Sequence, residues 1–285
     1  MILIGTRGSA LALAQANLVA DALGMPSELR VISTAGDRTD RPIPELGDGV
    51  FVSAIEDALR AGDIDIAVHS LKDLPTSEPD DLVVVAVTAR EDPRDVIVTR
   101  ARNGLRGLRA GQRVGTSSPR RDAFLRALVP GIECVGIRGN VDTRLRKVED
   151  GEYDATILAA AGLRRLAIPF AEAEALPLEL CPPAPGQGAL AVQMRADHPL
   201  AKQVRATLDD EATRVAVETE REVLRLAGAT CALPLGVHAR RENGEIVADA
   251  ALAGQSGIRR TRARGSVPVE VARQIAEDLQ VVARV

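Results

Sequence analysis

The stretch GDIDIAVHSLKDLPT, residues 62 to 76, joins a short apolar segment to a polar loop that contains a proline. Residues 64–68 predict a buried β-strand, and Pro75 prevents a helix from continuing past the loop. In open α/β sheets, ligands collect at the carboxyl ends of such strands. The stretch therefore favours an α/β fold with a binding loop here, although a solvated surface loop is the alternative. The polar residues of the loop are His69, Ser70, Lys72 and Asp73.

The same plan occurs twice in the first 170 residues. Residues 1–24, MILIGTRGSALALAQANLVADALG, predict a strand, a Gly-Thr turn and a helix that ends at a glycine. Residues 113–131, RVGTSSPRRDAFLRALVPG, predict a strand, a turn and a helix with Ser118 as its N-cap. An acidic, glycine-containing segment and a strand follow in each half, at 62–68 and 151–163. The shared order predicts two similar, doubly wound α/β lobes.

Two proline-containing segments predict where the chain crosses between the lobes. AREDPRD, residues 89–95, separates two β-rich runs, and CPPAPGQG, residues 181–188, excludes helix but permits a sharp return. Beyond the second crossing we expect a strand at 189–194 and a helical segment at 200–226 that breaks at two consecutive aspartates.

The end of the chain predicts two or three strands and an amphipathic helix from about Pro268, which together would form a small α+β domain. The predicted domains are a first lobe at 1–90 and 189–206, a second lobe at 94–182, and a third domain at 211–285.

The composition excludes several classes of protein. The 285 residues are 46% hydrophobic and 27% charged, as in ordinary globular proteins. With one Tyr, three Phe and no Trp, the chain has no aromatic platform for nucleic-acid bases, and its net charge of -4 does not favour a polyanion. No apolar run approaches the ~20 residues that cross a bilayer, and no leader opens the chain, so we expect a cytoplasmic protein without membrane association.

Three cysteines and three histidines are too few and too scattered for a disulfide framework or a metal site. Cys134 lies in an apolar run, which predicts a small core residue. Cys231, in LAGATCALPLG, stands between small residues on a loop that is open to covalent modification, although an inert thiol is the common outcome. We therefore expect no metal.

Arginine accounts for all but three of the 36 basic residues, so its placement matters. Arg120 and Arg121 stand in the first turn of a predicted helix, where cations oppose the helix dipole. They suit a docked anion, to which the free helix N–H groups, Thr116 and Ser117 would also donate. The alternative is a solvated charge pair.

The matching turn of the first lobe holds Arg7 and Ser9. Ser9 would contact a second anionic group or simply cap the helix. Two such turns predict a cleft for a small ligand with several carboxylates or phosphates. In that cleft Asp73 is the only obvious acid, either a catalytic carboxylate or the ion partner of an arginine. Further arginines follow later strands, at Arg138, Arg144 and Arg165.

Taken together, these segments resemble the porphobilinogen deaminase, or hydroxymethylbilane synthase, family. The resemblance runs in order through TRGSALALAQ, VAVHSLKDLPT, REDPRD, VGTSSPRR, IRGNVDTRL, GEYDATILAAAGL, PAPGQGAL and the Cys231 loop. It implies two periplasmic-binding-protein-like α/β lobes and a small α+β C-terminal domain. It also implies a transferase that condenses four porphobilinogen molecules, with loss of ammonia, and releases 1-hydroxymethylbilane.

The resemblance implies a role for each candidate residue. Cys231 would form a thioether to a dipyrromethane cofactor, and Asp73 would be the catalytic carboxylate. The other cofactor contacts would be Ser70, Lys72, Thr116, Ser117, Arg120, Arg121, Arg138 and Gly139. The substrate contacts would be Arg7, Ser9, Phe51, Arg144 and Arg165.

Two loops depart from the family pattern. Asp48, in LGDG, replaces the cation of a GGKG segment that many members have, and Ala229–Thr230 replace a doublet that is often Gly-Gly. The rival function is a cytoplasmic two-lobed module that binds small anions or senses an effector, which gives Cys231 and Asp73 no task. The resemblance further implies a monomer and hand-over of the product to uroporphyrinogen-III synthase.

Overall fold

The structure is a computed structural model that describes residues 1–34, 52–77, 79–169, 174–228 and 233–281. The chain divides into two compact units. The first comprises Met1–Glu91 with Gly188–Val215, and the second comprises Asp92–Gln187 with Ala216–Val285. Within the described ranges, no helix is both long enough and apolar enough to span a membrane.

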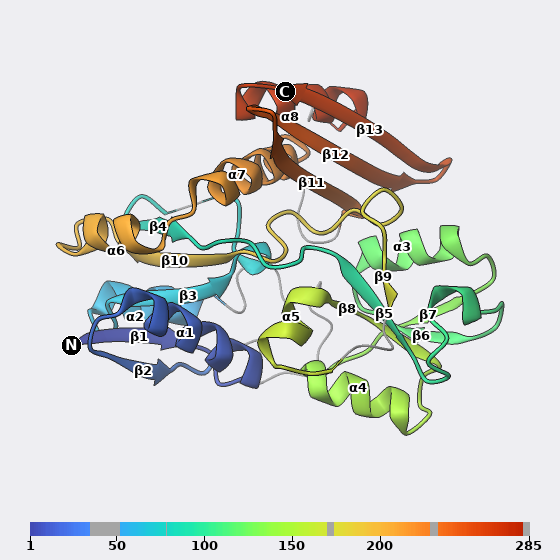
Figure 1. The fold of residues 1–285 in the computed structure, drawn as a ribbon, viewed down its shortest axis with the longest axis horizontal. Helices are drawn as coiled ribbons and strands as arrows, with labels where there is room; N and C mark the ends of the chain where they lie inside the picture. Colours follow the sequence, from blue (N-terminus) through green and yellow to red (C-terminus); the bar gives the residue numbers. More distant parts are fainter. Residues whose placement is uncertain (35–51, 78, 170–173, 229–232, 282–285) are drawn as a thin grey trace. The chain divides into compact units, whose positions relative to one another are not determined.

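One five-stranded sheet forms the centre of the first unit. Its strands are β1 (Ile2–Thr6), β2 (Ser27–Val31), β3 (Ile66–Ser70), β4 (Leu82–Val87) and β10 (Leu190–Arg195). They lie in the order β2-β1-β3-β10-β4 (Figure 1). The first three are parallel, whereas β10 runs antiparallel to both of its neighbours. The strand predicted at residues 64–68 is therefore confirmed as β3, two residues further along.

Helices cover both faces of this sheet because successive side chains of a strand point to opposite sides. Ile66 packs in one cluster with residues of α1 (Ala10–Leu23) and α6 (Ala201–Leu208). Its neighbour Ala67 packs in another cluster with residues of α2 (Ser53–Ala61).

The second unit contains a sheet with the same plan. Its strands are β5 (Asp95–Thr99), β6 (Arg113–Gly115), β7 (Glu133–Val135), β8 (Ala155–Ala159) and β9 (Glu174–Ala175). They lie in the order β7-β6-β8-β5-β9. Here too the first three are parallel, and the fourth, β5, runs antiparallel to β8 and β9. The prediction of two similar α/β lobes is confirmed.

The helices of this sheet are α3 (Pro119–Leu128), α4 (Val141–Glu149) and α5 (Ala160–Arg165). Phe124 of α3 is fully buried against the sheet residues Val114 and Ile157. The strand expected at 151–163 is shorter than predicted, because α5 begins directly after β8. Its alanines explain the switch, since alanine is the strongest helix former.

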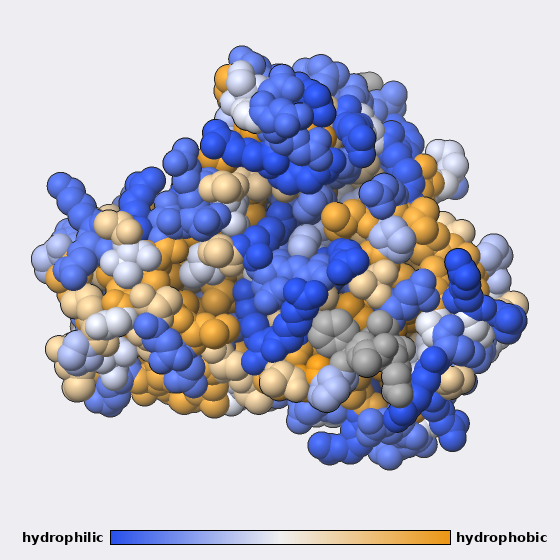
Figure 2. All heavy atoms as spheres, viewed as in Figure 1, coloured by the Kyte–Doolittle hydropathy of each residue, from blue (hydrophilic) through white to orange (hydrophobic). Residues whose placement is uncertain are grey.

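An antiparallel sheet of β11 (Leu235–Glu242), β12 (Glu245–Gly254) and β13 (Gly257–Gly265) follows, with α8 (Pro268–Asp278) packed against it. The exposed surface of this part is mainly hydrophilic (Figure 2). The predicted helix break is also confirmed. α6 ends at Leu208, and Asp210 accepts a hydrogen bond from Thr213 N at 2.8 Å at the start of α7 (Glu211–Leu226).

Candidate functional site

The carboxyl end of β1 leads into the capped start of α1. Ser9 Oγ accepts a hydrogen bond from Ala12 N at 3.2 Å, and Thr6 Oγ1 donates to the Ala12 carbonyl at 3.1 Å. The capping role that the sequence allowed for Ser9 is therefore confirmed, and contact with an anion stays a prediction. Arg7 lies between them and is partly exposed.

The loop after β3 places Asp73 at the same edge of the sheet. Ser70 exchanges hydrogen bonds with the buried Gln15 of α1, at 3.0 and 3.2 Å. Leu71 is buried, and its N–H donates to the Ala189 carbonyl at 3.1 Å. The loop is thus fixed to α1 and to the segment before β10, while Asp73 itself is exposed. Within the described part of the chain no ion pair is formed by Asp73, and its role stays a prediction.

His69 is a structural residue beneath this loop. Its ring Nε2 lies 3.1 Å from Gln193 Oε1, and Gln193 Nε2 donates to Glu56 Oε1 at 3.0 Å. Burial lowers the pKa of His69 to about 4, against the smaller opposing effect of the Gln193 hydrogen bond. His69 is therefore neutral at physiological pH and ties β3 to β10.

In the second unit, the loops after β6 and β7 are locked together. Ser117 Oγ donates to the Ile137 carbonyl at 2.9 Å and lies 3.1 Å from Ile137 N, which donates to it. Thr116 Oγ1 accepts from Ser118 N at 3.2 Å, and Ser118 caps α3 by accepting from Arg121 N at 3.4 Å. The predicted N-cap is confirmed.

Like charges gather beside these loops. Burial, followed by the charges of Arg121 and Arg138, lowers the pKa of Arg144 to about 10. Arg144 Nε donates to the Gly139 carbonyl at 2.8 Å. Gly139 has φ +108°, and a Cβ there would lie 2.7 Å from Thr143 Cγ2, so only glycine fits. A bound anion would relieve the mutual repulsion of these guanidiniums, and anion binding by them stays a prediction.

The structure contradicts the interpretation of Arg120 and Arg121 as a solvated charge pair. Both side chains are buried: Arg120 is 4% exposed and Arg121 is 8% exposed. Each guanidinium lies 2.7 Å from a different carboxylate oxygen of Asp95, which is 0% exposed. Burial alone would raise the pKa of Asp95, but the two arginines hold it well below its usual range. Their predicted contact with an external ligand stays a prediction.

Asp95 is the polar residue that sequence reasoning missed. It ends the first crossing segment and opens an apolar strand, so an acid directly before VIVT was the available signal. A buried acid at a strand start requires a charge partner, and two arginines occur 25 and 26 positions later.

The remaining candidates are distributed as follows. Arg165 lies in the last turn of α5 and is partly exposed. Burial, with a smaller contribution from Asp122, raises the pKa of the half-buried Cys134 to about 12, as suits a structural thiol. Phe51, Asp48, Ala229–Thr230 and Cys231 lie outside the described residues.

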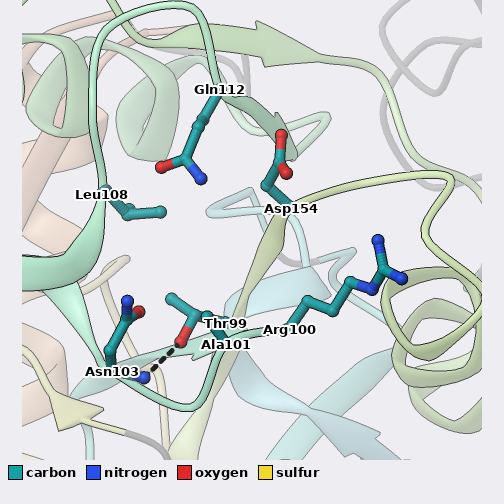
Figure 3. Close-up of a pocket in the computed structure, with 7 residues that line it drawn as sticks. All are labelled: Thr99, Arg100, Ala101, Asn103, Leu108, Gln112 and Asp154. Atoms are coloured by element: carbon teal, nitrogen blue, oxygen red, sulfur yellow. Dashed lines mark hydrogen bonds between the residues drawn. The ribbon is translucent and has the colours of Figure 1, made fainter.

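A cavity of about 330 Å³ lies elsewhere in the second unit (Figure 3). Thr99 ends β5, and Gln112 and Asp154 precede β6 and β8, so the cavity lies at the opposite edge of the sheet from Asp95. Figure 3 shows the hydrogen bond that Asn103 N donates to Thr99 Oγ1, at 3.0 Å. None of the predicted site residues lines this cavity.

The fold and the site together define a class: an α/β protein with two similar sheets whose strand-end loops carry arginines, hydroxyls and the exposed Asp73. A family model described as "Porphobilinogen deaminase, dipyromethane cofactor binding domain" matches residues 2–203. The chain belongs to the porphobilinogen deaminase family.

Relatives named porphobilinogen deaminase match most of the chain. One from Nocardia farcinica is 48% identical over 88% of this chain and 75% of its own length. One from Roseiflexus sp. is 44% identical over 98% of this chain and 95% of its own length. Among solved structures, the GluR0 ligand-binding core from Nostoc punctiforme in complex with L-glutamate matches 73% of this chain and 91% of its own. That match has a TM-score of 0.38 and 11% identity.

Proposed function

We propose that this chain is a hydroxymethylbilane synthase, a transferase that condenses four porphobilinogen molecules head to tail with loss of ammonia and then releases 1-hydroxymethylbilane. Family membership supports the reaction class, because the relatives that match most of the chain are named porphobilinogen deaminase. The structural observation that carries the proposal is an exposed acid, Asp73, at a strand-end edge whose loop is held rigidly by buried contacts. The rival anion-sensing module is not favoured.

The arginine cluster fits the proposed substrate and cofactor. Each pyrrole unit carries an acetate and a propionate, and guanidiniums bind carboxylates with paired hydrogen bonds. Arg121 and Arg138 already stand close enough to Arg144 for their charges to act on it. A growing row of carboxylates would neutralise charges that now repel one another. The donor set is therefore chemically suited to a dipyrromethane.

The dipyrromethane, which we propose is held on the sulfur of Cys231, supplies the pyrrole carbon to which substrate is joined. This chain's own residues do the rest. Asp73 would accept a hydrogen bond from a pyrrole N–H, hold a proton for the departing amine, and offset the positive charge that develops on the substrate. Ser70, Lys72, Thr116, Ser117, Arg120, Arg121, Arg138 and Gly139 would hold the cofactor, and Arg7, Ser9, Phe51, Arg144 and Arg165 would hold the substrate.

Intact mass tests this function directly. Protein produced with ample porphobilinogen should be heavier than its sequence by one dipyrromethane, and should consume porphobilinogen. Cys231→Ser should have the bare sequence mass, whereas the matched control Cys134→Ser should keep the added mass. A wild-type chain at its bare mass that leaves porphobilinogen unconsumed would contradict the proposal.

Four further points belong to the proposal: a cytoplasmic location, a monomeric state, hand-over of product to uroporphyrinogen-III synthase, and domains at 1–90 with 189–206, 94–182 and 211–285. Sedimentation equilibrium tests the monomer, because a dimer would give twice the 30.1 kDa chain mass.

A further inference from the structure

Asp95 lies at the amino end of β5, and its carboxylate accepts hydrogen bonds at both oxygens. Oδ1 accepts from Arg121 Nε at 3.1 Å and Nη2 at 2.7 Å, and from Gln187 Nε2 at 3.0 Å. Oδ2 lies 2.7 Å from Arg120 Nη2. Because the side chain is fully buried, bulk water does not compete for these hydrogen bonds in the structure.

The two arginines extend these contacts to other parts of the second unit. Arg120 Nη1 donates to the Pro182 carbonyl at 2.7 Å, in the second crossing segment. Arg121 Nη1 donates to the Ile157 carbonyl of β8 at 3.1 Å. Asp95 therefore connects the start of α3 to a central strand and to the segment through which the chain leaves this sheet.

The charges of this group do not cancel. Two guanidiniums face one carboxylate, so the buried group carries a net positive charge. Part of that charge acts on the neighbouring cluster, because Arg121 contributes to the lowered pKa of Arg144. The position of Arg121 would therefore influence how strongly a carboxylate binds near Arg144.

We propose that Asp95 is a positioning residue for the hydroxymethylbilane synthase reaction, an inference that rests on the proposed function. Its carboxylate fixes the guanidiniums of Arg120 and Arg121 at the carboxyl edge of the second sheet, and so sets the positive field that acts on bound carboxylates. Without that charge, nothing would offset the repulsion between the two guanidiniums, and Arg121 would move from the position in which its charge acts on Arg144.

The test compares Asp95→Asn with Asp92→Asn. Asp92 is an acid three positions earlier in the same crossing segment, and it pairs with Arg94 and Arg164 instead of the arginines of α3. For each purified full-length variant, we would measure Tm, the fraction of chains that carry the dipyrromethane mass, and kcat and KM for porphobilinogen. Kinetics are run well below the lower Tm and expressed per loaded, folded chain.

We expect Asp95→Asn to reduce the loaded fraction and to raise KM by about tenfold or more, since it weakens hydrogen bonds between charged groups. Asp92→Asn should change KM less than about twofold, because partly exposed ion pairs contribute little free energy. An unchanged KM and loaded fraction in folded Asp95→Asn, despite a lower Tm, would reduce Asp95 to a structural role.

If Asp95→Asn does not fold, Asp95→Glu decides the question, because it keeps the charge and shifts the oxygens by one methylene. A folded Asp95→Glu with a raised KM supports positioning, and a folded Asp95→Glu with wild-type KM and loading overturns it. A wild-type chain that neither carries the added mass nor consumes porphobilinogen defeats the proposed function itself, a result distinct from either outcome.

Discussion

The two sheets share one spatial plan, three parallel strands followed by an antiparallel fourth, yet they use the acid at their carboxyl edge in opposite ways. In the first unit Asp73 is exposed, on a loop fixed by Gln15 and Leu71. In the second, Asp95 is fully buried between Arg120 and Arg121. An acid kept in water and without an ion pair in the described structure remains available for proton transfer, whereas an acid enclosed by two cations serves to hold them. Under the proposed function, the edge with Asp73 would be the reactive one and the edge with Asp95 would bind carboxylates.

Replacing Asp73 gives the largest expected effect on this comparison. Asp73→Asn should lower kcat by about 10²- to 10⁴-fold, the usual contribution of a positioned proton donor or acceptor. The free energy of unfolding should change by no more than about 0.5 kcal/mol, because the side chain is exposed. Porphobilinogen consumption and urea unfolding measure the two quantities. Unchanged turnover would remove Asp73 from the chemistry.

Removing the buried acid altogether should also lower stability. Asp95→Ala leaves two guanidiniums buried without a counter-charge, and the free energy of unfolding should fall by about 3–5 kcal/mol. Urea unfolding at neutral pH gives the number, with Asp73→Ala as the matched variant from the other sheet. An equal loss of unfolding free energy in both variants would contradict the proposed difference between the two edges.

His69 adds a pH dependence to the first unit. The unfolded chain takes up a proton on this ring near pH 6.5, but the folded chain does so only near pH 4. The stability from neutral His69 is therefore complete above pH 6.5 and is lost as the pH falls toward 4, by up to about 3 kcal/mol. His69→Gln should flatten the unfolding free energy over that window. A slope identical to that of the wild type would show that the ring titrates normally.

Replacing Gly139 should have the smallest of these effects, a modest loss of stability. Gly139→Ala should cost about 1–3 kcal/mol, because it meets both a positive φ and a close contact with Thr143. Gly244→Ala is the control, since Gly244 has φ +85° but no atom within 4 Å of the added Cβ. The difference between their Tm values isolates the contact. If Gly244→Ala costs as much, the close approach of Thr143 contributes nothing.

The sequence predicted those features that depend on residues close together in the chain. The strand-turn-helix units, the Ser9 and Ser118 caps and the break before α7 follow from neighbouring residues, and all are present. The boundary between β8 and α5 was placed too late, because an alanine-rich apolar run suits either element.

The pairing of Asp95 with the arginines of α3 could not be predicted in this way. It joins residues from different elements that are brought together only when the sheet forms. The same arginines at the start of a helix indicated an anion, and the sequence alone could not distinguish a ligand from a side chain of the same protein.

The position of β10 has a consequence for synthesis on the ribosome. The second sheet is built from one continuous stretch, residues 95–175, whereas the first lacks its strand between β3 and β4 until residues 190–195 have emerged. Although domains generally fold in the order in which they are made, here the later sheet has all its strands first. The first sheet therefore cannot be completed until β10 has been translated, and β10 follows every strand of the second sheet.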